Sequence, residues 1–337
     1  MSAHAIVYRR FKLATISRIG IGGFARRYAR AASVPGLIAA VTAAAHEKNP
    51  PMIIGGATNI LFPDADITTP VIHNQASGII PLDGRTLWIA SGTDMSDVVA
   101  YCLKNSRTGF SWAAGLPGTI GGAVYGNAGA FGGQMDQCVQ GVVSLERKGG
   151  GLALRYRDIS GCAFAYRTSA FKRLAHKGAA TVIVAVIVRA PRTRAMADEK
   201  ERAAHHRRYR MEHHPMLART LGSTFQNVPV EKIPLPVRAQ LADRIKRDPF
   251  PVIPAAVLLD RAGCKNLHVG GASFSAQHAN FIVASGQTSA GDVKKLCHQA
   301  HARVRREFGV ALAPEIIMHE KKFSSAMRRR KSAQRRK

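Results

Sequence analysis

The residues best suited to chemistry in this sequence are glycines that could hold a large, flat ligand. In residues 114–130, six of the 17 residues are glycine and none is charged. So many glycines cost conformational entropy on folding, and a loop that needs only plasticity is usually more polar. Backbone that passes close to a flat cofactor explains both features. The expected contacts in this run are Gly115, Pro117, Gly118, Thr119, Gly121, Gly122, Ala123, Asn127 and Gly129.

A second glycine cluster follows a predicted strand at residues 52–54. The strand breaks into two glycines, and a hydroxyl and an amide side chain come next. Glycine reaches positive φ without strain, so the N–H groups of such a loop can approach a phosphate closely. Taken alone, an ordinary turn explains the cluster better; beside the 114–130 run it predicts a pyrophosphate contact. The residues concerned are Gly55, Gly56, Ala57, Thr58, Asn59 and Ile60.

A third cluster, residues 20–25, satisfies a loose G-x-G-x-x-A pattern, which by itself is a weak signal for dinucleotide binding. The preceding residues 15–18 make a poor central strand. No acidic residue lies about 20 positions later to bind a ribose. The Rossmann interpretation is therefore rejected for this cluster.

The elements that must position these loops mix helices and strands without strict alternation. Short strands are expected at residues 52–54, 87–90, 142–145 and 181–188. Helices are expected after Ser33 and after Ser96, since serine accepts hydrogen bonds from the free N–H groups of a first turn. This irregular order favours an α+β fold over a parallel doubly wound sheet.

A charged segment divides the chain. Residues 192–214 are helical in propensity and poor in β-branched residues, so they are expected to link two domains. The clearest element of the second region starts at Ser289, where Asp292 completes a capping-box pattern. Apolar residues follow at helical spacing until Gly309, which is expected to end the helix.

The composition indicates a folded protein whose cysteine thiols stay reduced. The 337 residues allow two or three domains, and 46% are hydrophobic. No apolar run approaches the roughly 20 residues of a membrane helix. The cysteines lack C-x-x-C spacing and the thirteen histidines form no metal-binding pattern, so neither a metal site nor a disulfide framework is expected. The five cysteines are Cys102, Cys138, Cys162, Cys264 and Cys297.

The formal net charge of +28 would attract nucleotides, nucleic acid and anionic membranes. Because the charge is spread along the chain, biased base composition explains most of it. Residues 1–32 are rich in arginine and small residues, as in an organelle transit peptide, yet they merge directly into the first folded unit. Residues 321–337 hold nine Lys or Arg and no acid, which predicts a disordered tail with non-specific affinity for polyanions.

Five ordered motifs, together with the glycine loops, resemble those of the UDP-N-acetylenolpyruvoylglucosamine reductase family. The resemblance runs from about Ile19 to Glu315, and five motifs in the right order are far more specific than one glycine loop. The motifs are YRTSAFK at 166–172, GSTFQN at 222–227, AGCK at 262–265, GGA at 270–272 with His278-Ala279, and FGV to PE at 308–315.

The resemblance implies non-covalent FAD, NADPH as reductant and UDP-N-acetylglucosamine enolpyruvate as substrate. It implies a vanillyl-alcohol-oxidase or PCMH-type FAD-binding region of two subdomains at residues 1–191, a charged helical link at 192–214 and a substrate-binding α+β domain at 215–320, before the basic tail at 321–337. The short spacing between the YRTSAFK and GSTFQN motifs is similar to the family branch without an extra substrate-closing loop. A cytoplasmic monomer of bacterial type that makes a peptidoglycan precursor is expected, with organelle targeting as the alternative.

The same resemblance implies the chemistry, in which hydride goes to one carbon of an enol ether and a proton to its neighbour. Arg167 would neutralise the substrate carboxylate and the developing enolate, because a guanidinium carries fixed positive charge. Glu315 would assist as a protonated or hydrogen-bonding acid, and Ser223 would give the carbon its proton. The expected substrate contacts are Tyr166, Asn227, Lys265, which could neutralise the diphosphate, and His278.

The sequence departs from the family pattern in three places and leaves two alternatives open. Val228 stands between Asn227 and Pro229, Gln226 replaces a usual basic residue, and residues 229–255 look like an insertion rich in proline and charge.

One alternative function is an FAD-dependent oxidoreductase of the same fold that acts on another substrate, such as an alcohol. The other is a degenerate, basic descendant that binds polyanions without catalysis.

Overall fold

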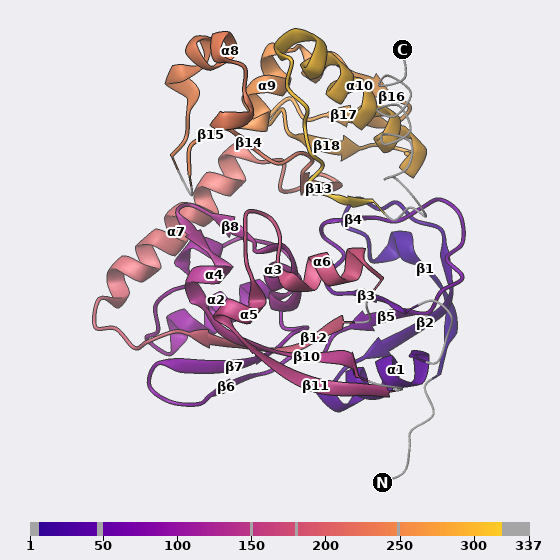
Figure 1. Ribbon diagram of the computed structural model, residues 1–337, viewed down its shortest axis with the longest axis vertical. Coiled ribbons are helices and arrows are strands. Elements are labelled where there is room, and N and C mark those ends of the chain that lie inside the picture. Colours follow the sequence, from indigo (N-terminus) through magenta and orange to yellow (C-terminus); the bar gives the residue numbers. More distant parts are fainter. Residues whose placement is uncertain (1–6, 46–49, 149–150, 179–180, 248–249, 319–337) are drawn as a thin grey trace.

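The first sheet brings together strands from residues 9 to 74. The computed structural model describes residues 7–45, 50–148, 151–178, 181–247 and 250–318 (Figure 1). The strands lie in the order β1-β2-β5-β3; β1 is antiparallel to β2, and β5 is parallel to both of its neighbours. The bounds are β1 Arg9–Lys12, β2 Phe24–Ala31, β3 Met52–Ile54 and β5 Val71–Asn74.

Helix α1 (Val34–Ala44) joins this sheet to the next one. Ser33 caps it as expected, because its hydroxyl accepts a hydrogen bond from the N–H of Gly36 at 3.2 Å. The buried Leu37 and Val41 of α1 pack with Leu145 and Val184 of the second sheet. The helix therefore fills the space between the two small sheets with apolar side chains.

The second sheet has five antiparallel strands in the order β11-β10-β12-β7-β6. Its middle strand β12 reads TVIVAVIVR and is almost continuously buried, as expected for an apolar run of this kind. Helices α2, α3 and α6 pack on this part of the molecule (Figure 1). The bounds are β6 Ile79–Pro81, β7 Thr86–Ala90, β10 Val139–Lys148, β11 Gly151–Asp158, β12 Thr181–Arg189, α2 Met95–Lys104, α3 Ile120–Gly126 and α6 Ala170–His176.

The expected cap of α2 is wrong by two residues. Ser96 lies inside the helix, and the extended Asp94 precedes it. The cause is tertiary: Asp94 forms a bridge with Thr119, and the N–H of Met95 donates to the carbonyl of Gly118 at 2.9 Å. The glycine-rich run therefore decides where this helix begins. Short elements complete the region: β4 Ile60–Leu61, β8 Gly129–Ala130, β9 Gly133–Gln134, α4 Met135–Cys138 and α5 Ile159–Cys162.

Helix α7 (Met196–His213) is the charged segment expected between the domains, and it runs up one side of the molecule towards the C-terminal part (Figure 1). It does more than connect, because Glu199, Ala203 and Arg210 are buried against the rest of the chain. Glu199 accepts from the hydroxyl of Thr108 and pairs with Arg202 at 2.5 Å. The helix is thus fixed against the loops that follow α2.

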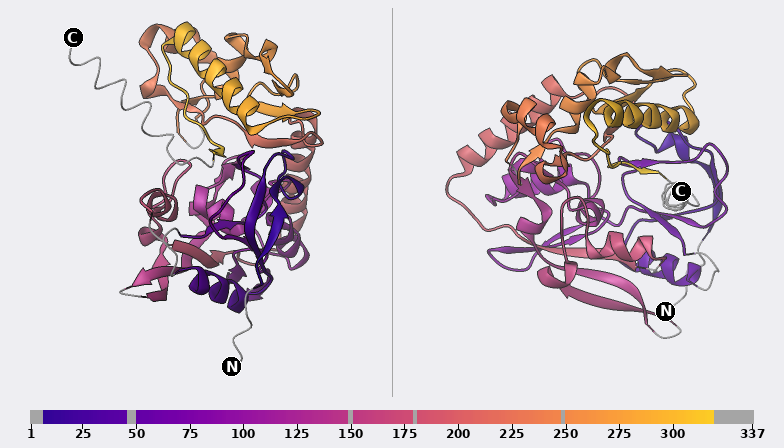
Figure 2. Two further views of the ribbon diagram at one scale, coloured as in Figure 1. Left: turned by 90° about the vertical axis from the view of Figure 1, so that its right-hand side faces the viewer. Right: turned by 45° about the horizontal axis from the view of Figure 1, so that its top comes forward.

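The C-terminal domain is a four-stranded antiparallel sheet, in the order β13-β18-β17-β16, covered by helices (Figure 2). Its last helix begins with the expected capping box of Ser289 and Asp292 and ends at Gly309, whose φ of 66° is left-handed. The bounds are β13 Thr220–Ser223, β14 Val228–Pro229, α8 Leu235–Gln240, β15 Val252–Ile253, α9 Ala255–Arg261, β16 His268–Val269, β17 Ala272–Phe274, β18 Phe281–Ala284 and α10 Ala290–Phe308.

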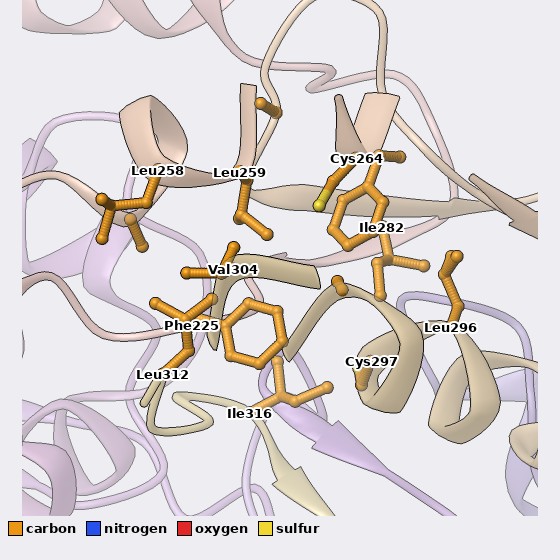
Figure 3. Close-up of a cluster of buried hydrophobic side chains, with 14 of the residues drawn as sticks. Phe225, Leu258, Leu259, Cys264, Ile282, Leu296, Cys297, Val304, Leu312 and Ile316 are labelled. Carbon is orange, nitrogen blue, oxygen red and sulfur yellow. The ribbon is translucent and has the colours of Figure 1, made fainter. Parts of the chain in front are cut away.

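The core of this domain lies between α9, α10 and the sheet (Figure 3). Phe225, at 2% exposure, packs among apolar side chains from all of these elements. Burying one large apolar side chain contributes about 1.5–3 kcal/mol. Figure 3 shows Phe225 among Leu258, Leu259, Ile282, Leu296, Val304, Leu312 and Ile316.

Hydrogen bonds from several elements join the C-terminal domain to the first sheet region. The carboxylate of Asp64 accepts from the N–H groups of Ala290 and Gly291, at the start of α10. Arg219 donates to the carbonyls of Ile19 and Gly20. Strand β19 (Ile317–Met318) returns to pair in parallel with β4. The end of the described chain therefore lies against the loop that carries the second glycine cluster.

Several sequence expectations concern the ends of the chain. Residues 9–12 and 24–31 form strands of the first sheet, whereas residues 1–6 and the basic tail at 321–337 lie outside the described residues. Within the described residues, no helix combines the length and apolar character needed to span a bilayer. The cluster at residues 20–25 does not follow a strand, since a 3-10 turn at Leu13–Thr15 precedes it. All five cysteines are free and buried.

Candidate active site

A cavity of about 1200 Å³ lies between the two sheet regions, α7 and the C-terminal domain. Both predicted glycine loops line it, as do parts of the YRTSAFK and GSTFQN motifs. The sequence therefore predicted the two loops and parts of two motifs that form a portion of its wall. The predicted residues on the lining are Gly55, Gly56, Ala57, Thr58, Asn59, Ile60, Pro117, Gly118, Thr119, Gly121, Gly122, Ala123, Gly129, Tyr166, Arg167, Ser223, Asn227, His278 and Glu315.

The two glycine loops pack directly on each other. A Cβ on Gly55 would overlap the hydroxyl of Thr119, and a Cβ on Gly56 would lie 3.0 Å from the Cα of Gly118. Gly118 has a φ of +102°, and a Cβ there would lie 2.7 Å from the Thr58 hydroxyl. A side chain at these positions would therefore collide with the neighbouring loop, whether or not a ligand is bound.

Gly122 and Gly126 differ, because their missing side chains would point into open space. A Cβ on Gly122 would meet only the Thr119 hydroxyl, at 3.5 Å, and one on Gly126 would meet nothing within 4 Å. Both residues line the cavity. Backbone is therefore open to a ligand along one side of α3, as the glycine-rich run predicts for a flat cofactor.

Two predicted cofactor contacts support the loop from behind and do not line the cavity. Asn127 is fully buried and left-handed with a φ of 46°, and its amide donates to Asp136 at 3.1 Å and to the carbonyl of Ala165 at 3.2 Å. A Cβ on Gly115 would lie 3.0 Å from the Cδ of Arg210. Asn127 thus ends α3 and ties it to the YRTSAFK motif.

Arg167 and Glu315 meet across the cavity although 148 positions separate them in the sequence. Nε of Arg167 lies 2.7 Å from Oε1 of Glu315, so the two side chains form an ion pair. The Nε–H bond of Arg167 does not point at this oxygen closely enough to count as a hydrogen bond. Both side chains are 20% exposed. Arg167 also donates to the carbonyl of Gly129 at 3.1 Å. The guanidinium therefore joins the glycine run to the last segment of the described chain.

The backbone around Arg167 is held in an unusual conformation. Its φ is 54°, left-handed and uncommon for a residue with a side chain. Ala165 and Thr168 exchange backbone hydrogen bonds around it, and Ser169 caps α6 while donating to the carbonyl of Tyr125 at 2.8 Å. Lys172 donates to the carbonyl of Arg167 at 3.0 Å. The YRTSAFK motif thus builds the turn that directs Arg167.

Burial dominates the electrostatics of these groups. It raises the pKa of the Glu315 carboxyl, although the cations of Arg167 and Lys172 act in the opposite direction. It lowers the pKa of Lys172 and raises the pKa of Tyr166. A carboxyl with a raised pKa is more readily protonated near neutral pH, which is the state expected of Glu315 in the chemistry above.

Ser223 is the last residue of β13 and lies next to the segment that carries Glu315. The N–H of Glu315 donates to the carbonyl of Thr224 at 2.8 Å, and Phe225 bridges to Pro314. On its other side Ser223 pairs in register with Phe281 of β18. The proposed proton donor, the acid and the guanidinium therefore come from three separate segments onto one cavity.

The predicted substrate contacts divide into two groups. Tyr166, Asn227 and His278 line the cavity, whereas Lys265 lies outside the lining and pairs with Asp260 at 3.0 Å. Asn227 accepts from the N–H of Ala255 at 3.1 Å, so its side chain also fixes the start of α9. Burial, with the charge of Lys246 adding to it, lowers the pKa of His278 to about 4.

Arg210 is a cavity residue that sequence reasoning missed. It is 7% exposed, donates from Nε to the carbonyl of Ala114 at 3.0 Å, and stacks its guanidinium 4.9 Å above the ring of Phe131. One of its terminal nitrogens is buried without a protein partner, and burial lowers its pKa to about 10. Nothing in the arginine-rich sequence of α7 distinguishes Arg210 from Arg207 and Arg208.

The charged groups of the lining favour anionic ligands. Five Lys or Arg side chains line the cavity, and Glu315 is the one acid among the described lining residues. Burying a cation without a counter-charge is costly, so such groups usually face an anion. A diphosphate or a carboxylate would meet this need. The five cations are Arg18, Arg167, Lys172, Arg210 and Lys246.

The open glycine backbone of α3 and the buried terminal nitrogen of Arg210 that has no protein partner fit a flavin dinucleotide. The fold with its separate C-terminal domain is that of an FAD-dependent oxidoreductase. A family model described as FAD binding domain matches residues 25–151. A second, described as UDP-N-acetylenolpyruvoylglucosamine reductase, C-terminal domain, matches residues 214–319. The FAD that the family resemblance implies is confirmed.

Whole-chain similarity identifies the family. A UDP-N-acetylenolpyruvoylglucosamine reductase of Solibacter usitatus is 30% identical over 305 residues, which span 90% of this chain and 94% of the relative. One of Synechococcus is 28% identical over 305 residues, 90% and 88% of the two chains. The chain therefore belongs to the UDP-N-acetylenolpyruvoylglucosamine reductase family, as the sequence motifs predict.

A solved structure supports the fold. The UDP-N-acetylenolpyruvylglucosamine reductase of Thermus caldophilus superposes with a TM-score of 0.71 at 24% identity, covering 94% of this chain and 100% of that one. The expected α+β architecture, an FAD-binding N-terminal region followed by a C-terminal domain of this family, is confirmed. Within the described residues, no group of three or more His, Cys, Asp or Glu side chains could hold a metal ion.

The open side of α3 yields a first prediction. Gly122→Val should weaken FAD binding about 10–100-fold, because added bulk in a closely packed site typically costs 1–3 kcal/mol. Valine is a better helix former than glycine, so α3 itself should not suffer. The measurement is a titration of the apoprotein with FAD, followed by flavin fluorescence. Gly151→Val is the matched control, since a Cβ there meets nothing within 4 Å and the residue lies outside the cavity lining. Equal FAD affinity in both variants would remove α3 from the cofactor site.

Proposed function

We propose that the chain reduces UDP-N-acetylglucosamine enolpyruvate to UDP-N-acetylmuramate, a peptidoglycan precursor, with bound FAD and with NADPH as reductant. The observation that carries the proposal is the meeting of Arg167, Glu315 and Ser223 on the cavity lined by the open glycine backbone. The family to which the chain belongs supports the same reaction.

The substrate is an enol ether that carries a carboxylate. Bound FAD would supply the hydride for one carbon of the double bond, with NADPH as its source. Arg167 provides a fixed positive charge for the carboxylate, and this charge also stabilises the enolate that develops during reduction. The left-handed turn at Arg167 and its hydrogen bond to Gly129 hold the guanidinium in place before substrate arrives.

Glu315 and Ser223 complete the reaction. The raised pKa of Glu315 favours its protonated form, and in that form it donates a hydrogen bond to the substrate carboxylate and so favours the enol. The hydroxyl of Ser223 gives its proton to the carbon next to the one that received hydride. A serine hydroxyl is a weak acid, so Ser223 regains its proton from a neighbouring group or water.

The cavity residues divide between the ligands. Residues 55–60 and 117–123 and Arg210 would hold FAD, and Tyr166, Asn227 and His278 would contact the nucleotide sugar. No separate NADPH motif is visible in the sequence, so NADPH and substrate would occupy the same part of the cavity in turn. We further propose a cytoplasmic monomer, in keeping with five free, buried cysteines and a reductant of the cell interior.

Anaerobic flavin spectroscopy tests the proposal. Purified protein should be yellow, should bleach on addition of NADPH, and should regain its colour on addition of the enolpyruvyl nucleotide. The product should be heavier than the substrate by two hydrogen atoms. An alcohol-oxidising flavoenzyme would instead bleach with an alcohol and ignore the enolpyruvyl nucleotide. A colourless protein that binds no FAD would favour the degenerate polyanion-binding descendant.

The basic tail gives a second prediction. Removing residues 321–337 should leave turnover unchanged within about twofold, because the tail follows the last family motif. The variant should lose part of its affinity for heparin or RNA, because each lost contact with an anionic group weakens binding. The salt dependence of binding should fall for the same reason. The measurements are steady-state turnover and binding of a fluorescent RNA at several salt concentrations. Loss of FAD from the truncated protein would show that the tail belongs to the cofactor-binding fold.

A further inference from the structure

Residues 229–247 and 250–255 are the described part of a segment that the family resemblance leaves unexplained, and they bring one residue, Lys246, to the cavity lining. Their two ends pair as β14 and β15, with Val228 opposite Ile253. Lys246 extends this pairing, because it exchanges two backbone hydrogen bonds with Val252, at 2.9 and 2.8 Å. A stem of paired backbone therefore fixes the position of Lys246.

Lys246 lines the cavity beside two imidazole rings. His214 and His278 lie edge to face, with ring centroids 5.2 Å apart. Burial lowers the pKa of each to about 4, and the charge of Lys246 adds to this effect, so both rings are neutral at pH 7. Among the described residues, no carboxylate pairs with Lys246.

The same segment contacts two residues that are expected to bind substrate. Its Phe250 packs edge to face on Tyr166, with centroids 5.0 Å apart. The N–H of Ala255, at its end, donates to the side chain of Asn227. Lys246 thus belongs to a segment that spans from the N-terminal region to the GSTFQN motif.

We infer that Lys246 binds the diphosphate of the nucleotide sugar, the task that the sequence resemblance assigns to Lys265. This inference rests on the proposed function. Lys265 is paired with Asp260 outside the cavity lining, whereas Lys246 is on the lining with no described acid to neutralise it. A compact ammonium with three donors suits a diphosphate, whose charge is spread over several oxygens. His214 and His278 are neutral at pH 7, so these two rings add no positive charge of their own near Lys246.

The nucleotide sugar fits Lys246 better than FAD does. The charge of Lys246 acts on His278, which belongs to the C-terminal domain, whereas the interlocked glycine loops of residues 55–59 and 117–122 lie in the N-terminal region. Arg210 and the open backbone of α3 already suit the flavin. Lys246 is therefore a specificity-determining contact for the second ligand.

The test compares Lys246→Met with Arg247→Met in the FAD-loaded protein. Both side chains are exposed and adjacent in the sequence, but only Lys246 is on the lining, so both variants lose one charge from the same loop. Calorimetric titration with UDP should give a Kd about 10–100-fold higher for Lys246→Met, the range expected for one hydrogen bond to a charged group. The Kd of Arg247→Met should stay within about twofold of wild type. Lys246→Arg should retain most of the affinity, while FAD content stays constant in all variants.

Three results would overturn the inference: an unchanged Kd for UDP in Lys246→Met, an equal loss in Arg247→Met, or loss of FAD from Lys246→Met. UDP binding needs no turnover, so the outcome is independent of the proposed reaction. A wild-type protein that binds UDP through Lys246 but fails to reduce the enolpyruvyl nucleotide would overturn the proposed function alone. A wild-type protein that turns over while Lys246→Met keeps its UDP affinity would overturn the inference alone.

Discussion

Ser223→Ala should leave reduction of the flavin by NADPH nearly unchanged and slow its reoxidation by the enolpyruvyl nucleotide about 10²–10⁴-fold, the usual contribution of one positioned proton donor. Reduction by NADPH transfers hydride and needs no proton donor for carbon. Reoxidation needs one, and Ser223 is the hydroxyl that lies beside the Glu315 segment on the cavity lining. Stopped-flow absorbance of the flavin, with each half-reaction run alone, separates the two effects.

A matched serine provides the control for this experiment. Ser285 lies in the same domain, donates to the carbonyl of Gly271 and is absent from the cavity lining. Ser285→Ala should leave both half-reactions unchanged. Equal slowing of both halves in Ser223→Ala would indicate damaged flavin binding. Normal reoxidation in that variant would exclude Ser223 from the mechanism.

The parts of the fold that the sequence predicted well are governed by local rules. Ser289 and Asp292 form the expected capping box and Gly309 takes the expected left-handed conformation. Ser33 caps α1 for the same reason. In these cases the hydrogen-bond partners lie within three or four residues, so the sequence alone specifies the geometry.

The errors occur where distant contacts override local preference. Ser96 is a good capping residue, yet α2 starts earlier because Asp94 and Met95 are bound to the glycine-rich run at residues 118–119. Asn127 and Gly115 belong to the predicted loop but support it from behind. A motif identifies the loop, whereas only packing decides which of its residues face the ligand.

The same limit applies to the candidate site. The ordered motifs selected Arg167, Ser223 and Glu315, and all three line one cavity. Their separate roles are predictions. Arg210 and Lys246 were missed, because 49 Lys and Arg residues give no reason to select two. Arg210 is distinguished by burial without a counter-charge. Lys246 is distinguished by the backbone pairing with Val252 and by its place on the cavity lining.

The pairing of Arg167 with Glu315 leads to the other large effect. Glu315→Gln should slow reoxidation of the flavin about 10²–10⁴-fold, because an amide cannot take part in proton transfer. Arg167→Lys should also impair this half-reaction, since one ammonium cannot copy the forked donors of a guanidinium. Neither change should affect reduction by NADPH. Glu307→Gln, on the surface of α10, is the matched control and should behave as wild type.

The pH dependence distinguishes an acid from a purely structural carboxylate. If protonated Glu315 is the active form, reoxidation falls as pH rises through its pKa. Burial raises that pKa and the positive charge of Arg167 lowers it. Arg167→Met removes the lowering influence, so the alkaline limb of the rate profile should move to higher pH in the residual activity. In Glu315→Gln the limb should disappear, because no group remains to titrate there. A limb that keeps its position in both variants would mean that another group controls the profile, and Glu315 would then serve only to hold Arg167 in place.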